Sequence, residues 1–266
     1  MFMKKTTILL ICFIIIFSCY RVPITNRNQI RLLPETMLTS LALSSYSEFI
    51  SKHTIVPVND YRSQEIEKVG NKLVNAANEL FGSSKYKDRI KGQKWEFKLV
   101  EKSEVNAWCM PGGKIVFYTG ILPYTQDENG IAVVMGHEMA HAIAKHGNER
   151  MSQQLAIIMG GVALDVALNE KPEETREIFK SLYGISSTMG ALAYSRKHEY
   201  EADKIGLVLM AKAGYEPQKA IEFWERMSKK GGSSIPQFLS THPSDENRIR
   251  EMKKFLPTAL KYYKTP

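Results

Sequence analysis

The spacing of apolar side chains predicts helices in the first third of the chain. Apolar residues recur at three- and four-residue steps over residues 35–51 and again over residues 60–81. This is the period of an amphipathic helix with one buried stripe. Gly82 and the two serines after it end the second pattern. We therefore expect two helices, each packing one face against the rest of the domain.

The period then changes to two. Trp95, Phe97 and Leu99 alternate with more polar neighbours, and residues 114–118 form a second β-rich run. Pro111 and the glycines at 112 and 113 mark a turn between them. The pattern predicts a small antiparallel sheet leading into an apolar segment, residues 130–146, whose composition favours helix.

That sheet has two possible roles. Its strands can serve only as core, or an exposed edge strand can hold an extended peptide by main-chain hydrogen bonds. The alternation does not separate the two. If the edge binds substrate, the candidate residues are Asn106, Ala107 and Trp108.

From residue 126 onward the patterns are mostly helical. Residues 155–168 and 179–194 are apolar, but glycine, serine or aspartate interrupts them and both are too short to cross a bilayer comfortably. We expect buried or surface-packed helices there.

The segment 130–146 carries the pentad His137-Glu138-Met139-Ala140-His141. On a helix, the four-residue spacing places His137 and His141 on one face, where both imidazoles can reach one metal ion. Glu138 lies about 100 degrees round, beside the open coordination position, where a carboxylate can take a proton from an activated water. Such a pentad also arises by chance, so a third ligand has to be found elsewhere.

A second predicted helix, residues 195–206, supplies the third ligand. Glu199 and Asp203 are four residues apart and share a face, so Glu199 can complete a two-histidine, one-carboxylate set. Asp203 is placed to accept the outer N–H of a ligand histidine. Glu201 and His198 point elsewhere, and Glu201 is interpreted as part of a solvated acidic face. His146 falls on the wrong face for the same ion and is interpreted as a capping or surface residue.

Four motifs in this order, NAWCMPGG, HEMAHAIAKH, EYEAD and STHPSDENRI, resemble the gluzincin peptidases of metallopeptidase family forty-eight. This family includes the HtpX heat-shock and CAAX prenyl proteases, and the chain is most similar to its LoiP-like periplasmic lipoprotein branch. The resemblance covers about residues 35 to 256. It implies one zinc ion on His137, His141 and Glu199, with Glu138 as general base and Asp203 behind the ligands.

The same resemblance implies that His242 and Arg248 face the active site. His242 would donate to the developing oxyanion and Arg248 would be a supporting charge. Alternatively, His242 occupies the fourth zinc position at rest and holds the enzyme latent. The sequence leaves both roles open.

Composition and charge add the cellular setting. The chain has 266 residues, 44% of them hydrophobic, and a net charge of +8 that falls to +6 without Lys4 and Lys5. The charge surplus is not clustered into the basic, aromatic stripe of a nucleic-acid-binding surface. Those lysines and the apolar run after them predict a lipoprotein signal peptide over residues 1–18, with Cys19 lipidated; an uncleaved anchor helix is the alternative.

In the mature chain Cys109 would then be alone, without an intrachain disulfide, and is interpreted as a small hydrophobic residue. The polar residues 19–34, with three arginines, predict an extended tether from the membrane. Residues 35–266 would form the metalloprotease domain.

The sequence thus predicts an α+β, mainly helical fold: a zincin-type metalloprotease domain with a small antiparallel sheet beside the pentad helix. We expect a zinc metalloendopeptidase that is lipid-anchored at the bacterial cell envelope, faces the periplasm with the outer membrane slightly favoured, and cleaves unfolded or misassembled proteins. Its expected partners are polypeptides and the membrane, not nucleic acid. The rival hypothesis is a latent or non-catalytic, chaperone-like binding module with a zinc site.

Overall fold

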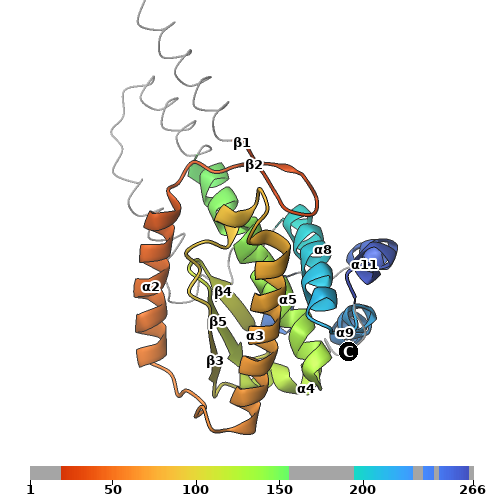
Figure 1. The fold of residues 1–266 in the computed structure, drawn as a ribbon. Coiled ribbons are helices and arrows are strands. Elements are labelled where there is room, and N and C mark those ends of the chain that lie inside the picture. Colours follow the sequence, from red (N-terminus) through yellow and green to blue (C-terminus); the bar gives the residue numbers. More distant parts are fainter. Residues whose placement is uncertain (1–18, 156–194, 230–235, 243–245, 264–266) are drawn as a thin grey trace, which may run out of the picture.

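Helices make up most of the fold, and a three-stranded sheet lies among them (Figure 1). The computed structural model describes residues 19–155, 195–229, 236–242 and 246–263. Its longer elements are α2 (Glu35–Ser51), α3 (Tyr61–Phe81), β3 (Glu96–Val100), β4 (Ala107–Met110), β5 (Lys114–Tyr118), α5 (Glu128–Ala144), α8 (Arg196–Lys212), α9 (Gln218–Lys229) and α11 (Glu246–Leu260). The mainly helical α+β fold predicted from the sequence is confirmed.

The shorter elements connect these. They are β1 (Cys19–Arg21), β2 (Asn28–Ile30), α4 (Leu122–Thr125), α10 (Gln237–Thr241) and the 3₁₀ turns η1 (Lys87–Arg89) and η2 (Thr119–Ile121). Helix α2 has the bounds expected from its apolar period. Helix α3 begins one residue later than expected because Asp60 serves as its N-cap, accepting a hydrogen bond from the Arg62 backbone N–H at 2.8 Å.

The sheet has the strand order β3-β5-β4 and is mixed. Strands β4 and β5 form an antiparallel hairpin around Pro111, Gly112 and Gly113, with Trp108 opposite Val116. Strand β3 pairs with the other edge of β5 and runs parallel to it, which the antiparallel prediction missed. Apolar alternation marks a strand but carries no information about which neighbour it pairs with or in which direction.

The two faces of the sheet pack against different helices. Along β5, Ile115 and Phe117 enter the main core with α3 and α5, whereas Val116 and Tyr118 point to the opposite face. There Phe49 of α2 stacks on Tyr118 with ring centroids 6.1 Å apart. Figure 1 shows α2 on one side of the sheet and α3 and α5 on the other. The sheet is therefore buried on both sides and holds α5 against its inner face.

The segment expected as an extended tether folds back onto the domain. Strands β1 and β2 pair antiparallel, and Gln29 on β2 is almost fully buried. Its amide donates to the Ala144 carbonyl at 2.6 Å, at the C-terminus of α5. Further on, the Leu32 N–H donates to the Ser152 hydroxyl at 2.8 Å. Buried hydrogen bonds to the domain therefore fix this segment.

The apolar segments 155–168 and 179–194 lie, except for Leu155, outside the described residues. Within the described ranges, no helix is both long and apolar enough to cross a membrane.

Candidate metal and active site

Helix α5 presents the pentad from the centre of the core. Asp127 caps the helix by accepting from the Gly130 N–H at 2.9 Å, and nearly every residue after it is buried. His137 and His141 fall on one face, one turn apart, with their Nε2 atoms 3.1 Å from each other. The four-residue spacing therefore brings the two imidazole nitrogens together as expected.

Helix α8 brings the acidic residues to the same place. Ser195 caps this helix, and Glu199 and Asp203 lie one turn apart on its buried face. The two helices approach closely because glycines meet where they cross: a Cβ on Gly206 would lie 3.1 Å from the Gly136 carbonyl carbon. This is shorter than an ordinary van der Waals contact, so the crossing has no room for side chains.

The donor atoms fit a tetrahedral zinc ion. Ligand atoms about 2.0–2.1 Å from zinc lie about 3.3 Å from one another in a tetrahedron. The Glu199 oxygens lie 3.3 Å from His137 Nε2 and 3.4 Å from His141 Nε2. His242 Nδ1 lies 3.2 Å from both His137 Nε2 and a Glu199 oxygen. All four side chains are buried and form one potential metal-binding group among the described residues.

His242 comes from the end of α10 and is held there by its neighbours. Phe238 packs against its ring with centroids 4.9 Å apart, and Arg248 on α11 donates to its carbonyl at 3.2 Å. His242 Nδ1 thus lies close enough to His137 and Glu199 to share a metal ion with them. Of the two roles considered for it, this position matches a fourth ligand.

Glu138 lies beside these ligands but outside the tetrahedron. Its carboxyl accepts a hydrogen bond from the Cys109 backbone N–H on β4, and Oε1 has no hydrogen-bond partner within the described part of the chain. His242 Nε2 lies 3.4 Å from Oε1. Burial raises the pKa of Glu138 above its ordinary value, although the histidine charges oppose this. A buried carboxylate with one oxygen unpaired is suited to accept a proton.

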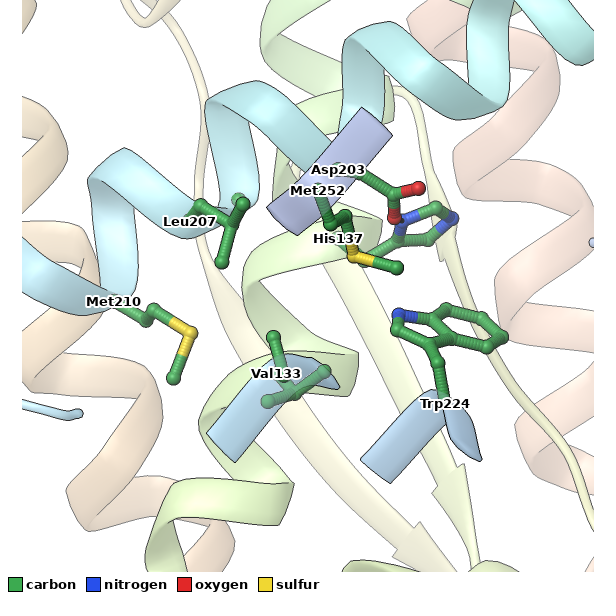
Figure 2. Close-up of a pocket in the computed structure, with 9 residues that line it drawn as sticks. Val133, His137, Asp203, Leu207, Met210, Trp224 and Met252 are labelled. Carbon is green, nitrogen blue, oxygen red and sulfur yellow. Dashed lines mark hydrogen bonds and ion pairs between the residues drawn. The ribbon is translucent and has the colours of Figure 1, made fainter. Parts of the chain in front are cut away.

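Asp203 and Arg248 stand behind His137. Figure 2 shows the Asp203 carboxylate against the imidazole, with the Trp224 indole nearby. Asp203 Oδ1 lies 3.0 Å from His137 Nδ1, and both carboxylate oxygens accept from the Arg248 guanidinium at 2.6 and 2.8 Å. Arg248 also lies 3.1 Å from Glu199 and 3.7 Å above the Trp224 ring. A proton on His137 Nδ1 leaves Nε2 free to bind metal.

A small cavity adjoins this contact. It has a volume of about 10 Å³, and its wall is mostly apolar: besides His137 and Asp203, it is lined by Val133, Gly206, Leu207, Met210, Ala220, Trp224 and Met252 (Figure 2). Such a space holds about one water molecule. The outer side of His137 is therefore nearly dry, which strengthens its hydrogen bond to Asp203.

The pKa shifts of the site residues show that it favours positive charge. Although burial opposes ionisation, His242 and Arg248 hold the pKa of Glu199 well below its usual range. Burial keeps the pKa of His141 well below its usual value, so this ring is neutral. For His137, burial lowers the pKa, but Asp203 and Glu199 raise it to about 9. The site therefore favours positive charge beside the carboxylates, as a metal cation would supply.

Comparison with known proteins agrees with this geometry. The model of peptidase family M48 matches residues 62–256, which include every candidate ligand. The chain belongs to peptidase family M48. This family consists of metalloendopeptidases, and the motif resemblance found in the sequence is confirmed at that level.

Several curated relatives of this M48 peptidase are similar over most of its length. The mitochondrial metalloendopeptidase OMA1 of Saccharomyces cerevisiae is 31% identical over 91% of this chain and 70% of its own. Human OMA1 is 29% identical over 90% of this chain and 46% of its own. A putative beta-barrel assembly-enhancing protease of Vibrio cholerae is 27% identical over 74% of this chain and 39% of its own. The chain thus spans less than half the length of the last two.

The proposed peptide-binding residues of the M48 peptidase lie on and beside β4, the outer strand of the sheet next to β5. Asn106, Ala107 and Trp108 are all buried. The Asn106 carbonyl accepts from the Tyr118 N–H at 3.1 Å, and the Trp108 indole donates to the Tyr118 hydroxyl at 3.2 Å. The side chains thus belong to the core, so any substrate contact would use the backbone edge. Cys109 is partly buried on the same strand.

Two interpretations of the sequence are wrong for this M48 peptidase. His146 is fully buried and is not at the surface. The prediction assumed that the helix of His137 and His141 continues to residue 146, but Lys145 adopts the left-handed conformation (φ 59°, ψ 36°) and ends α5 before it. Glu201 is also buried and is not part of a solvated face. No local pattern marks Glu201, because its partner Arg27 lies 174 residues away, and the left-handed turn that places His146 occurs at a non-glycine residue.

Proposed function

We propose that this chain is a zinc-dependent metalloendopeptidase that cleaves unfolded or misassembled proteins at the cell envelope. The observation that carries the proposal is the position of Glu138, one oxygen of which accepts no hydrogen bond from the described residues, beside a two-histidine, one-carboxylate set. Membership of family M48 supports peptide-bond hydrolysis. The name of the OMA1 relatives supports endopeptidase activity, and that of the putative beta-barrel assembly-enhancing protease supports a role linked to protein assembly.

His137, His141 and Glu199 would hold the zinc ion. Zinc would supply Lewis acidity, lowering the pKa of a water and polarising the scissile carbonyl. Glu138 accepts the proton from the attacking water and returns it to the leaving amine. Its buried position excludes bulk water, and the Cys109 N–H fixes the carboxyl group against β4. Asp203 and Arg248 keep His137 in the tautomer that presents Nε2.

The outer edge of β4 is the proposed substrate platform. An extended peptide would add to this strand by main-chain hydrogen bonds, a mode that tolerates many side chains and suits unfolded clients. Because the Cys109 N–H on this strand contacts Glu138, a peptide placed there would pass close to the base.

His242 sets the activity of the proposed site. In the position described above it lies beside His137 and Glu199, where it would compete with the attacking water for the fourth metal position. We infer a latent resting arrangement from which His242 must move before hydrolysis. After moving, its ring can act as a donor to the oxyanion, so the two roles considered for it can follow one another.

The second candidate is a non-catalytic binding module with a zinc site. The same four side chains favour it, because structural zinc sites have four protein ligands. Metal content and casein cleavage, measured for wild type, Glu138→Gln and His242→Ala, separate the functions. A peptidase should bind zinc and lose cleavage on chelation, and Glu138→Gln should bind zinc without cleaving.

The His242→Ala variant completes this comparison. Higher activity than wild type would show that His242 blocks the site, and a loss of about 10²–10³ in kcat would assign it to the oxyanion. Zinc binding without cleavage in all three proteins would favour the binding module. Cleavage by Glu138→Gln at the wild-type rate would refute the proposed mechanism.

A further inference from the structure

A second buried polar cluster lies behind His141, on the side away from the proposed metal position. Because Lys145 turns the chain at the end of α5, His146 Nδ1 comes to lie 2.9 Å from His141 Nδ1. A histidine that binds metal through Nε2 carries its proton on Nδ1 and donates it to an acceptor. His146 is in position to be that acceptor.

The contact continues to helix α8. With Nδ1 accepting, His146 carries its own proton on Nε2, which lies 3.0 Å from a Glu201 carboxylate oxygen. The His146 ring also stacks on His198 with centroids 4.5 Å apart, and His198 Nε2 lies 3.1 Å from Glu149. The tautomer of His141 is thereby coupled to a carboxylate through one intervening imidazole.

The N-terminal hairpin fixes that carboxylate. Arg27, between β1 and β2, donates to Glu201 at 2.5 and 2.9 Å and to both oxygens of Glu149 at 2.5 and 2.6 Å. The Thr25 hydroxyl donates to the other oxygen of Glu201. Gln29 joins Glu149 to the end of α5, donating to both. All three hairpin residues precede residue 62, where the match to the peptidase family begins.

Arg27 is important because Glu149 and Glu201 are both buried and share its guanidinium. Without it, two carboxylates would face each other in the core, and buried charges without a partner are strongly unfavourable. Glu201 would then lose the contacts that fix its carboxylate, and His146 would lose the acceptor that sets its tautomer.

We propose that His146 is a positioning residue for the metal ligand His141, and that the N-terminal hairpin holds it in place through Arg27 and Glu201. This inference rests on the proposed zinc site. The hairpin is then a working part of the metal centre and not only a connection to the membrane. Hydrogen bonds to the outer nitrogen of a metal-binding histidine typically contribute 10- to 100-fold to metal affinity.

The test measures zinc affinity of the full chain by competition with a chromophoric chelator. His146→Leu, which removes the acceptor, should weaken zinc binding 10- to 100-fold. His146→Asn places an amide oxygen near the former Nδ1 and should recover part of this loss. Arg27→Gln should also weaken binding, whereas Arg21→Gln, on the same hairpin but exposed and bonded to the Asn26 carbonyl, should not.

Two further readouts separate positioning from general stability. Thermal unfolding of the zinc-free variants reports the fold, and the visible spectrum of the cobalt-loaded protein reports ligand geometry. A changed spectrum in His146→Leu with partial return in His146→Asn supports positioning. Equal zinc affinity in wild type and His146→Leu overturns the inference. If His146→Leu loses zinc affinity but folded Arg27→Gln does not, the hairpin has no part in positioning His141.

The outcomes also separate this inference from the proposed function. If wild type itself does not bind zinc, the proposed function fails. If wild type binds zinc and His146→Leu binds it equally well, only the inference fails. Should Arg27→Gln not fold, the His146→Leu and His146→Asn pair still decides the central claim.

Discussion

The close crossing of α5 and α8 makes a quantitative prediction about Gly206. A methyl group there would lie 3.1 Å from both the Gly136 carbonyl carbon and the His137 backbone nitrogen. Both contacts are with backbone, so a whole helix has to shift by a few tenths of an ångström. Overpacking of this kind costs about 1–3 kcal/mol.

Gly147 provides the matched control. It also lies in a helical stretch, but a Cβ there would meet nothing within 4 Å. Both alanine variants gain the same helix propensity, about 0.5–1 kcal/mol. The difference between Gly206→Ala and Gly147→Ala therefore isolates the clash, and Gly206→Ala should be less stable by about 1–3 kcal/mol.

Thermal unfolding measures this difference. For a domain of this size, each kcal/mol shifts Tm by about 2–4 °C, so Gly206→Ala should melt several degrees below Gly147→Ala. The same shift moves Glu199 away from the histidines and should weaken zinc binding in the Gly206 variant alone. Equal melting temperatures and equal zinc affinities for the two variants would refute the claim that this crossing sets the ligand distances.

Two further predictions concern the N-terminal region. Although burial opposes it, hydrogen bonds from Arg27, His198 and Gln29 hold the pKa of Glu149 far below its usual 4.5. A lowered folded-state pKa stabilises above the unfolded value, so the unfolding free energy should fall as the pH drops below about 4.5, by about 1–2 kcal/mol at pH 3. Urea unfolding should show this loss in wild type and less of it in Glu149→Gln; identical pH profiles would contradict it. If Cys19 is lipidated, palmitate labelling should disappear in Cys19→Ala, and labelling that persists would exclude this anchor.

The sequence predicted those parts of the fold that depend on local periodicity. The bounds of α2 follow from three- and four-residue apolar repeats, and those of β5 follow from a short run of β-favouring residues. The histidine pair and the Glu199–Asp203 pair follow from the four-residue spacing on a helix. Each of these features is decided by residues within one or two turns of each other.

The features that were missed depend on contacts between distant segments. The parallel pairing of β3 with β5 requires the chain to reach β4 on the far side first and then return to β5 between the two, which alternation does not encode. The burial of Glu201 depends on Arg27, 174 residues away, and the position of His146 depends on one left-handed residue, Lys145. A non-glycine residue in that conformation leaves little trace in the sequence.

The charges of the proposed metal site do not balance by themselves. In the state that metal binding requires, with every ligand histidine neutral and the carboxylates ionised, Glu138, Glu199 and Asp203 carry three negative charges, and Arg248 supplies one positive charge. The group is left with two negative charges in a buried position, which is unfavourable without a counter-ion. A divalent cation supplies the missing charge, so the composition of this core fits a metal ion independently of the ligand distances.

The carboxylate charges of the cluster behind His141 have a partner in the protein itself. Glu149 and Glu201 are matched by Arg27, which binds both, and by Arg89, which reaches the cluster through Gln29. Because Arg27 is an ion-pair partner of both carboxylates, this cluster has a cation of its own without a metal. The two neighbouring sets of buried histidines and acids therefore differ: the first fits a bound cation, and the second has an arginine in the corresponding place.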